Sequence, residues 1–254
     1  MKRKTNSTGV AKKNSSSTLR MEDSQTLILA NKCRAKKRLR ELEQAELCRT
    51  DPLYWLRTHT KTFDEHWQEK GTEPYARFPD KPYFPYLFYL LRTERRLLLP
   101  KSREMGLSWA VIGYAVWLCQ FFERTRVIVQ AQKLEKVIDL VSGRGNPGYA
   151  RTLYEQQDQF LKDRHPLIKP STEMPGDMLA WANGSTLHGV PSGADQIRQY
   201  HPTVAIFDEA AHLDEFAESF GAAEPVASQI IALSSAAPSY FGDLSSDILD
   251  RVGT

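Results

Sequence analysis

Between Arg95 and Pro238 short apolar runs alternate with segments of helical spacing, and no other feature limits the possible folds of this chain so strongly. The runs typical of strands are RLLLP, RVIVQAQ, PTVAIFDEAAH and SQIIALSSAAP, and DMLAWANGSTLHGV predicts a hairpin that turns at Asn183-Gly184. The segments typical of helices are SWAVIGYAVWLCQFF, KLEKVIDLVSGRG and YARTLYEQQDQFLKDRH. Strands that alternate with helices predict an α/β fold, in which helices cover both faces of a mostly parallel sheet.

A first polar cluster, PKSREMGLS, lies between the strand RLLLP and the long apolar helix. It resembles a phosphate-binding loop, although Lys101 replaces the first glycine of the usual template and Leu107 replaces its lysine. Backbone N–H groups from Arg103 to Ser108 can surround phosphates, and Gly106 allows a close approach. Ser108 Oγ is placed to bind Mg²⁺, and Lys101 can deliver its charge from the other arm of the loop. Taken alone, this fragment is equally compatible with an ordinary strand–turn–helix.

A second cluster follows the strand TVAIF, where Asp208 and Glu209 stand side by side. Two adjacent carboxylates after a buried strand are costly unless a cation or a mechanism uses them. Phosphoryl-transfer sites divide such a pair, so we expect Asp208 to hold Mg²⁺ and Glu209 to orient and deprotonate the attacking water. The third cluster, Ser234 and Ser235, ends the strand IIAL, and these hydroxyls could sense a γ-phosphate. Because ligands bind beyond the carboxyl ends of parallel strands, the three clusters are predicted to converge.

The basic charge of the chain is concentrated at its start. Residues 1–50 contain 13 Lys and Arg against 5 Asp and Glu, a net charge of +8, whereas the whole chain carries +3. We therefore expect a disordered basic tail over residues 1–23, a basic helical arm over 24–50 and a catalytic domain over 51–254. The arm is equally compatible with a solvated helix and with contact to nucleic acid or a protein partner.

The segment 51–92 is rich in aromatic residues and is interrupted by prolines, which leaves room for short helices at about 52–59 and 85–95. Its aromatic side chains are expected to cover the core, with Tyr83 and Tyr86 as candidates for packing on a purine ring. Three widely spaced cysteines indicate neither a disulfide framework nor a zinc site. No apolar run approaches the ~18 residues of a membrane span, and the N-terminus has no signal-peptide core. A soluble, intracellular protein is expected.

In this order, the three clusters resemble the ATPase domain of phage terminase large subunits, the DNA-packaging motors of tailed phages. KSREMGLSW is similar to that family's deviant Walker A loop, VAIFDEAA to its Walker B motif with the catalytic glutamate, and LSSAAP to its coupling motif. The resemblance covers about residues 50–240 and implies a P-loop (RecA-like, ASCE) fold. It also implies ATP and Mg²⁺ as cofactors, and the host cytoplasm as location. The implied partners are double-stranded DNA, a portal protein and a small terminase subunit. The working form would be a homo-oligomeric ring, with a monomer in isolation.

Carried over by position, the resemblance assigns Glu209, Arg103 and Lys101 to catalysis, with Arg103 as the cation of the transition state. The resemblance assigns Mg²⁺ binding to Ser108 and Asp208, and it assigns contact between subunits to Arg198. The nucleotide-binding set comprises Lys101, Ser102, Arg103, Glu104, Met105, Gly106, Leu107, Ser108, Trp109, Tyr83 and Tyr86. The coupling set comprises Ser234, Ser235 and Ala236.

Two departures from the family pattern stand out. The family's adenine segment usually carries a glutamine, and none occurs between Arg77 and Lys101. The family's large subunit also has a C-terminal nuclease domain, whereas 16 residues follow Pro238 here, so no nuclease activity is expected of this chain. Two alternatives remain: a helicase-type nucleic-acid-dependent ATPase, and an assembly module that binds nucleotide without hydrolysing it.

Overall fold

The computed structural model describes residues 15–103, 105–143 and 146–252 and divides the chain into two units, Met1–Glu46 and Leu47–Thr254. Helix α1 (Ser15–Thr50) accounts for the described part of the first unit. This helix begins at Ser15, inside the stretch for which a disordered tail was predicted, and residues 1–14 lie outside the described part. Between residues 10 and 51 no glycine or proline interrupts the chain, so nothing stops the helix from extending.

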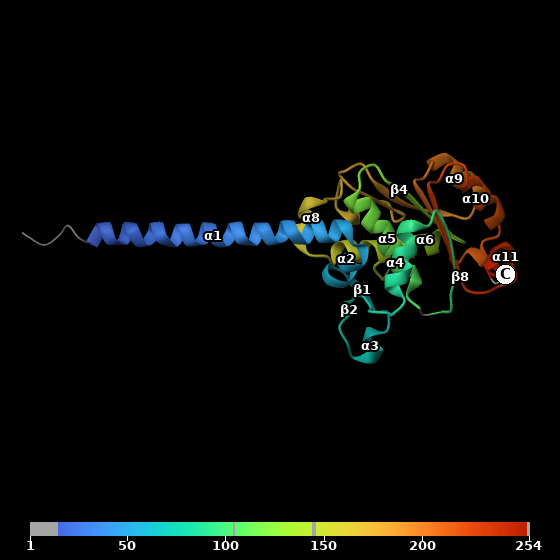
Figure 1. Cartoon of the computed structure of the whole chain (residues 1–254), viewed down its shortest axis with the longest axis horizontal. Coiled ribbons are helices and arrows are strands. Elements are labelled where there is room, and N and C mark those ends of the chain that lie inside the picture. Colours follow the sequence, from blue (N-terminus) through green and yellow to red (C-terminus); the bar gives the residue numbers. More distant parts are fainter. Residues whose placement is uncertain (1–14, 104, 144–145, 253–254) are drawn as a thin grey trace, which may run out of the picture. The chain divides into compact units, whose positions relative to one another are not determined.

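The second unit is built on a six-stranded sheet within the described residues (Figure 1). In order across the sheet, the strands are β3 (Arg96–Pro100), β8 (Gln229–Ser234), β7 (Val204–Asp208), β4 (Arg126–Ala131), β6 (Thr186–Pro191) and β5 (Met178–Ala180). All neighbouring pairs are parallel except β5 and β6, which form the predicted hairpin. The predicted α/β fold with a mostly parallel sheet is confirmed, and the arrangement is consistent with a RecA-like P-loop fold.

Helices cover both faces of this sheet. One face packs against α9 (Ala194–Tyr200), α10 (Phe216–Ala223) and α11 (Tyr240–Val252) around buried Phe207 and Ile230. The other face packs against α5 (Leu107–Phe121) and α6 (Leu134–Val141). Twelve of the fifteen residues of α5 are buried, as expected of a helix that is apolar on all sides. A Cβ at Gly113 of α5 would lie 2.8 Å from Leu56, so the glycine allows α2 (Pro52–His59) to pack closely.

The proline-rich segment contains both of the short helices predicted for it. Helix α2 (Pro52–His59) begins where the Asp51 carboxylate accepts hydrogen bonds from Leu53 N and Tyr54 N at 2.9 and 3.0 Å. Helix α4 (Phe84–Thr93) also has a proline in its first turn. Between them, a two-stranded sheet of β1 (Lys61–Phe63) and β2 (Tyr75–Arg77) encloses the short helix α3 (Trp67–Lys70).

The single helix predicted over YARTLYEQQDQFLKDRH is two helices, α7 (Tyr149–Glu155) and α8 (Gln159–Arg164). The break lies at Gln157, whose buried amide exchanges hydrogen bonds of 2.8 and 3.0 Å with Gln120 of α5. Trp55 Nε1 donates to the same side chain at 3.3 Å. The hydrogen bonds of this buried amide stabilise the chain more than an unbroken helix would. This is a tertiary effect, which helical spacing does not reveal. In the part of the chain that the structure describes, no helix is long and apolar enough to cross a membrane.

Candidate active site

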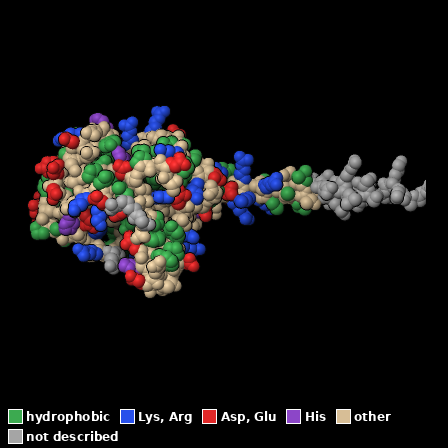
Figure 2. Space-filling model, turned by 180° about the vertical axis from the view of Figure 1, so that it is seen from behind, with side chains coloured by type: hydrophobic (Ala, Val, Ile, Leu, Met, Phe, Trp, Pro, Cys, Tyr) green, Lys and Arg blue, Asp and Glu red, His purple; other side chains and the backbone are tan. Residues whose placement is uncertain are grey.

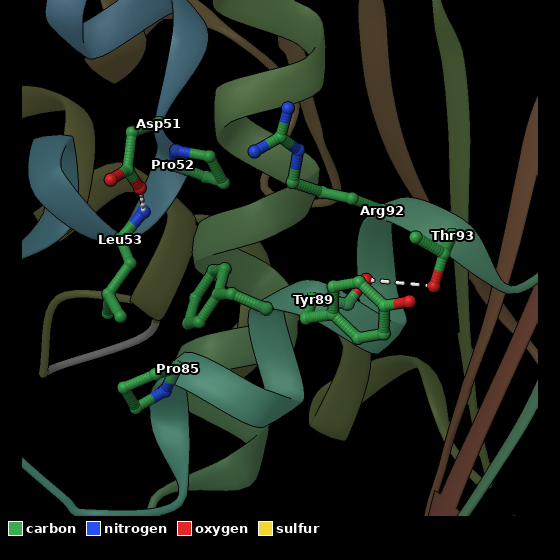
Figure 3. A pocket seen from close by; sticks show the side chains of 8 residues that line it. Asp51, Pro52, Leu53, Pro85, Tyr89, Arg92 and Thr93 are labelled. Carbon is green, nitrogen blue, oxygen red and sulfur yellow. Dashed lines mark hydrogen bonds between the residues drawn. The ribbon is translucent and has the colours of Figure 1, made fainter.

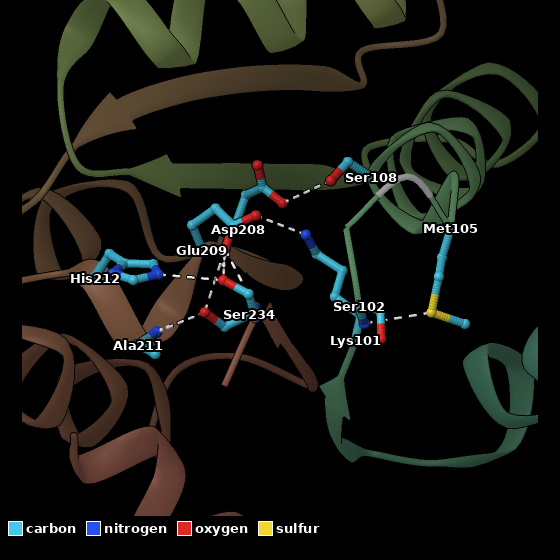
Figure 4. A network of polar contacts seen from close by, with 10 residues as sticks. Lys101, Ser102, Met105, Ser108, Asp208, Glu209, Ala211, His212 and Ser234 are labelled. Atoms are coloured by element: carbon cyan, nitrogen blue, oxygen red, sulfur yellow. Dashed lines mark hydrogen bonds and ion pairs between the residues drawn. The ribbon is translucent and has the colours of Figure 1, made fainter. Parts of the chain in front are cut away.

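The three predicted polar clusters meet at one edge of the sheet because β3, β8 and β7 are neighbours. Pro100 pairs with Ser234, and Asp208 pairs with Leu233, so all three strands end at the same level. Lys101 N donates to Ser234 O at 2.9 Å, which extends the ladder by one residue beyond β3. Figure 4 shows the resulting network of side chains. The predicted convergence is thus observed in the structure.

Lys101 forms an ion pair with Glu209 across this edge. Its Nζ lies 2.6 Å from Glu209 Oε1, and only 9% of the lysine side chain is exposed. Figure 4 shows the lysine stem extending from the loop toward the two carboxylates. A lysine of this kind is not a solvated strand end, and its charge is directed into the cluster.

Glu209 is held by several further donors. Its Oε2 accepts hydrogen bonds from Ser234 Oγ at 3.3 Å and from the backbone N and the Oγ of Ser235, both at 3.2 Å. Its backbone has φ 52°, a left-handed conformation that costs energy in a non-glycine residue and commonly marks functional sites. Burial alone raises the pKa of Glu209, but the hydrogen bonds from Lys101 and Ser235 outweigh burial and lower it. Glu209 is therefore a fixed, ionised carboxylate near neutral pH.

The two serines continue the network away from Glu209. Ser234 Oγ accepts a hydrogen bond from Ala211 N at 3.0 Å, and Ser235 Oγ lies 3.2 Å from His212 Nε2. Ala211 and His212 belong to the 3₁₀ turn Ala210–His212, which precedes α10. The end of β8 is thus joined through its hydroxyls both to Glu209 and to the segment that follows β7.

Asp208 and Ser108 form the second contact of the cluster. Ser108, in the first turn of α5, donates its Oγ hydrogen to Asp208 Oδ1 at 2.9 Å. Burial raises the pKa of Asp208 to about 6, although the hydrogen bond from Ser108 and the charge of Lys101 oppose this shift. A buried carboxylate beside a hydroxyl suits Mg²⁺, which binds through one or two protein oxygens and completes its shell with phosphates and water. The donor set therefore fits the predicted magnesium site, although among the described residues no group of three His, Cys, Asp or Glu could hold a metal ion.

Asp208→Asn is expected to stabilise the fold at pH 8. Because the pKa of Asp208 is raised from 3.8 to about 6, the folded chain bears the cost of a buried carboxylate above about pH 6. Protonation removes that cost as the pH falls from about 6 to about 4. Asparagine is uncharged at every pH, so its burial does not carry the desolvation cost of a carboxylate. Its Oδ1 can still accept a hydrogen bond from Ser108. Urea unfolding should show a gain of up to about 3 kcal/mol at pH 8 that shrinks at pH 5.

The matched control for this substitution is Asp214→Asn, which removes the charge of an exposed carboxylate. It should change the free energy of unfolding by no more than about 0.5 kcal/mol at either pH. A variant at Asp208 that is less stable than the parent at pH 8 would contradict the assignment of a costly buried charge.

The loop that carries Lys101 is shaped by Gly106. Its φ of 74° is left-handed, and a Cβ there would approach nothing closer than 3.9 Å, so backbone conformation and not space requires the glycine. Leu107 then begins α5 with 6% of its surface exposed, so its side chain faces the core. The first N–H groups of α5 are left for a ligand or water. Glu104, which the sequence included in the nucleotide-binding set, lies outside the described residues.

The remaining predicted residues are distributed around this loop. Tyr83 OH donates to Met105 O, and Met105 Sδ in turn accepts from Ser102 N at 3.3 Å. The Trp109 ring stacks on Tyr149 with centroids 4.0 Å apart. Tyr83 is therefore placed against the loop, which engages its hydroxyl, and its contact with a purine stays a prediction.

Four other predicted residues are not part of the network. Tyr86 is 66% exposed and stacks on Tyr89, which lines a separate cavity of about 500 Å³ between α2 and α4 (Figure 3). Arg198 is exposed on α9 and pairs with Asp195 at 2.9 Å. Arg103 and Ala236 are exposed. The structure thus leaves purine contact by Tyr86 and the roles of the two arginines as predictions.

A cavity of about 580 Å³ opens beside Ser108, Asp208 and Glu209. The sequence did not predict its other lining residues, which are Glu65, Lys136, Asp139, Leu140, Asn146, Pro147 and Tyr149. The sequence pattern could have indicated Lys136 and Asp139 as lining residues, because α6 directly follows β4 and begins at the same edge of the sheet. No local sequence pattern places Glu65 and Tyr149 at the cavity, since they reach it only through the packing of distant segments.

No known family model matches the sequence, and no curated protein matches it. Several solved structures are similar. The HK97 bacteriophage large terminase is 16% identical, covering 70% of this chain and 38% of that chain with a TM-score of 0.48. A large terminase from a thermophilic bacteriophage in complex with ADP is 15% identical, covering 68% and 43% with a TM-score of 0.45. The Thermus phage P74-26 large terminase ATPase domain is 14% identical, covering 71% and 72% with a TM-score of 0.39. The present chain thus spans less than half of the first two proteins, and at these identities the similarities concern the fold alone.

Proposed function

We propose that this chain is a Mg²⁺-dependent ATPase and that it serves as the motor domain of a viral terminase large subunit. One observation carries the first part: the contacts Lys101–Glu209 and Ser108–Asp208 place a cation, a hydroxyl and two carboxylates together at the carboxyl edge of the sheet. These are the groups that phosphoryl transfer to water requires. The second part rests on the resemblance of the three motifs to terminases.

The loop that carries Lys101 and Gly106, together with the start of α5, would bind the nucleotide. The N–H groups after Gly106 face the position where phosphates bind at a helix N-terminus. The Lys101 side chain, directed into the cluster, adds a charge-assisted contact to the β- and γ-phosphates. Ser108 and Asp208 would hold Mg²⁺, which when bound neutralises charge on the phosphate oxygens. Tyr83, linked to Met105 O, would lie on the side of the purine.

Hydrolysis needs a base, and Glu209 has the properties of one. Its hydrogen bonds from Ser234 and Ser235 fix the carboxylate in one orientation, and its lowered pKa keeps it able to accept the proton of the attacking water. Lys101 competes for the same carboxylate, so a phosphate that attracts Lys101 would release Glu209 to the water. Exposed Arg103, which lies in the same loop as Lys101, is proposed as the cation that stabilises the transition state.

The proposed coupling runs through the end of β8. Ser235 Oγ lies within 3.2 Å of both Glu209 Oε2 and His212 Nε2. A shift of Glu209 during the reaction would therefore change the hydrogen bonding of the turn before α10. Ser234 and Ser235 would thereby transmit the state of the nucleotide to the helices on that face, and Ala236, which is outside the network, is assigned the same role from the resemblance alone.

The partners proposed for the chain come from the resemblance. They are double-stranded DNA, a portal protein, a small terminase subunit and further copies of the chain in a ring, in which exposed Arg198 would contact the neighbouring subunit. In this arrangement ATP hydrolysis would drive DNA into a procapsid in the host cytoplasm.

The proposal is tested by phosphate release from ATP, with Mg²⁺ or with EDTA, and with or without duplex DNA. We expect turnover that requires Mg²⁺ and rises with duplex DNA. Nucleotide binding without turnover under all conditions would contradict the ATPase assignment and favour a non-hydrolysing assembly module. ATP-dependent separation of DNA strands would contradict the packaging assignment and favour a helicase-type enzyme.

A further inference from the structure

The basic segment of α1 has no part in the proposed ATP site. Residues 31–40 are all exposed, and six of these ten are Lys or Arg: Lys32, Arg34, Lys36, Lys37, Arg38 and Arg40. Figure 2 shows Lys and Arg side chains along this helix. The ion pair of Lys37 with Glu41 is 3.8 Å long and its lysine is 80% exposed, so it neutralises little of this charge.

Helix geometry spreads these charges around the axis. Successive residues are about 100° apart, so the six basic side chains cover an arc of about 240°. The remaining arc holds a narrow apolar stripe of Ala35, Leu39 and Leu42. Along the axis the six charges occupy about 12 Å, a length over which duplex DNA presents about seven phosphates. The charge density of the helix therefore matches that of a nucleic acid duplex.

Other anionic partners match this surface less well. A helix that lies on a membrane needs a broad apolar face with large side chains, whereas this stripe is narrow and contains alanine and leucine. The core of a protein interface is depleted in charged residues, whereas six of the ten residues here are charged. Single-stranded nucleic acid is usually bound through stacking on aromatic rings, and residues 15–50 contain no Phe, Tyr or Trp. A helix of about 10–12 Å diameter fits the major groove of B-DNA, which is about 12 Å wide and has phosphates on both sides.

We propose that the segment Lys32–Arg40 of α1 binds double-stranded DNA through its phosphates, with the helix in the major groove and without base specificity. The basic arc lies toward the two phosphate rows, and the apolar stripe lies away from the bases. This assigns the duplex a binding surface separate from the ATP site, and the assignment holds whether or not that site hydrolyses ATP.

The test measures binding of the full chain to a fluorescent 30-base-pair duplex without nucleotide, over a series of salt concentrations. Each phosphate contact contributes about −0.9 to the slope of log K against log salt. The variant K36Q/K37Q/R40Q should make the slope shallower by about 2.7 and weaken binding on the order of 100-fold at about 0.15 M salt. Glutamine has nearly the helix propensity of lysine and arginine, so circular dichroism should show unchanged helix content.

The matched control is R77Q/R164Q/K169Q, which removes the same net charge from exposed positions in the second unit. It should keep the parental slope. An unchanged slope for the α1 variant, or equal losses in both variants, would overturn the proposal. Equal affinity for a single strand of the same length, or tighter binding to phosphatidylserine vesicles than to the duplex, would also overturn it. Turnover of ATP without DNA should be the same in the α1 variant and the parent, which separates this proposal from the ATPase assignment.

Discussion

Glu209→Gln is expected to lower the rate of ATP hydrolysis by ~10²–10⁴-fold while leaving nucleotide affinity near the parental value. The amide keeps the shape of the side chain, and its oxygen can still accept from Lys101, Ser234 or Ser235. It cannot accept the proton of the attacking water, so the loss falls on the chemical step. Single-turnover hydrolysis and equilibrium binding of a fluorescent ATP analogue would separate the two effects.

Glu215→Gln is the matched control for this prediction, because it makes the same chemical change at an exposed carboxylate six residues away. It should hydrolyse ATP at the parental rate. If Glu209→Gln also turned over at that rate, Glu209 would not be the base, and its network with Lys101 and the two serines would be structural.

Lys101→Ala is expected to weaken ATP binding by 10- to 100-fold and to lower turnover further. A charge-assisted contact to phosphate contributes roughly 1.5–3 kcal/mol, and more where charge develops in the transition state. The structure adds a second effect. Lys101 holds down the pKa of Glu209, so its removal should raise that pKa and shift the acidic limb of the pH–rate profile to higher pH. Binding titrations and hydrolysis between pH 5 and 9 would measure both.

Two neighbouring variants make the result for Lys101 specific. Arg103→Ala should keep nucleotide affinity near normal and lower turnover, as expected of a cation that acts mainly in the transition state. Leu107→Ala should destabilise the fold by about 2–5 kcal/mol, because Leu107 is buried, yet leave ATP affinity of the folded protein unchanged. The interpretation that Lys101 supplies the charge of the lysine missing at position 107 fails if Lys101→Ala equals the parent in both affinity and turnover.

Much of the site could be predicted because its parts are local in the chain. An apolar run followed by polar residues is a strand end, and parallel strands present their carboxyl ends at one edge. The clusters at Lys101, Asp208 and Ser234 therefore had to lie on the same side of the sheet once the strands were identified. The left-handed turn at Gly106 was likewise signalled by the residue type alone.

The sequence could not identify the partner of each group. That Lys101 pairs with Glu209, and that Ser234 and Ser235 surround the same carboxylate, depends on β8 lying between β3 and β7. The pairing of β3 with β8 joins segments more than 100 residues apart, and no local pattern records it. The raised pKa of Asp208 has the same origin, because it follows from how deeply the strand end is buried.

By itself, then, the sequence determined the alternation of strands and helices, the three polar clusters and the basic character of the N-terminal helix. These properties follow from periodicity, residue type and charge, which are local. Only the tertiary structure decided where the helix after Tyr149 breaks, because Gln157 is buried against Gln120. It also decided that Glu65 and Tyr149 share a cavity with Asp208. Such contacts arise when distant segments exclude water together, and their energy has no counterpart in a short stretch of chain.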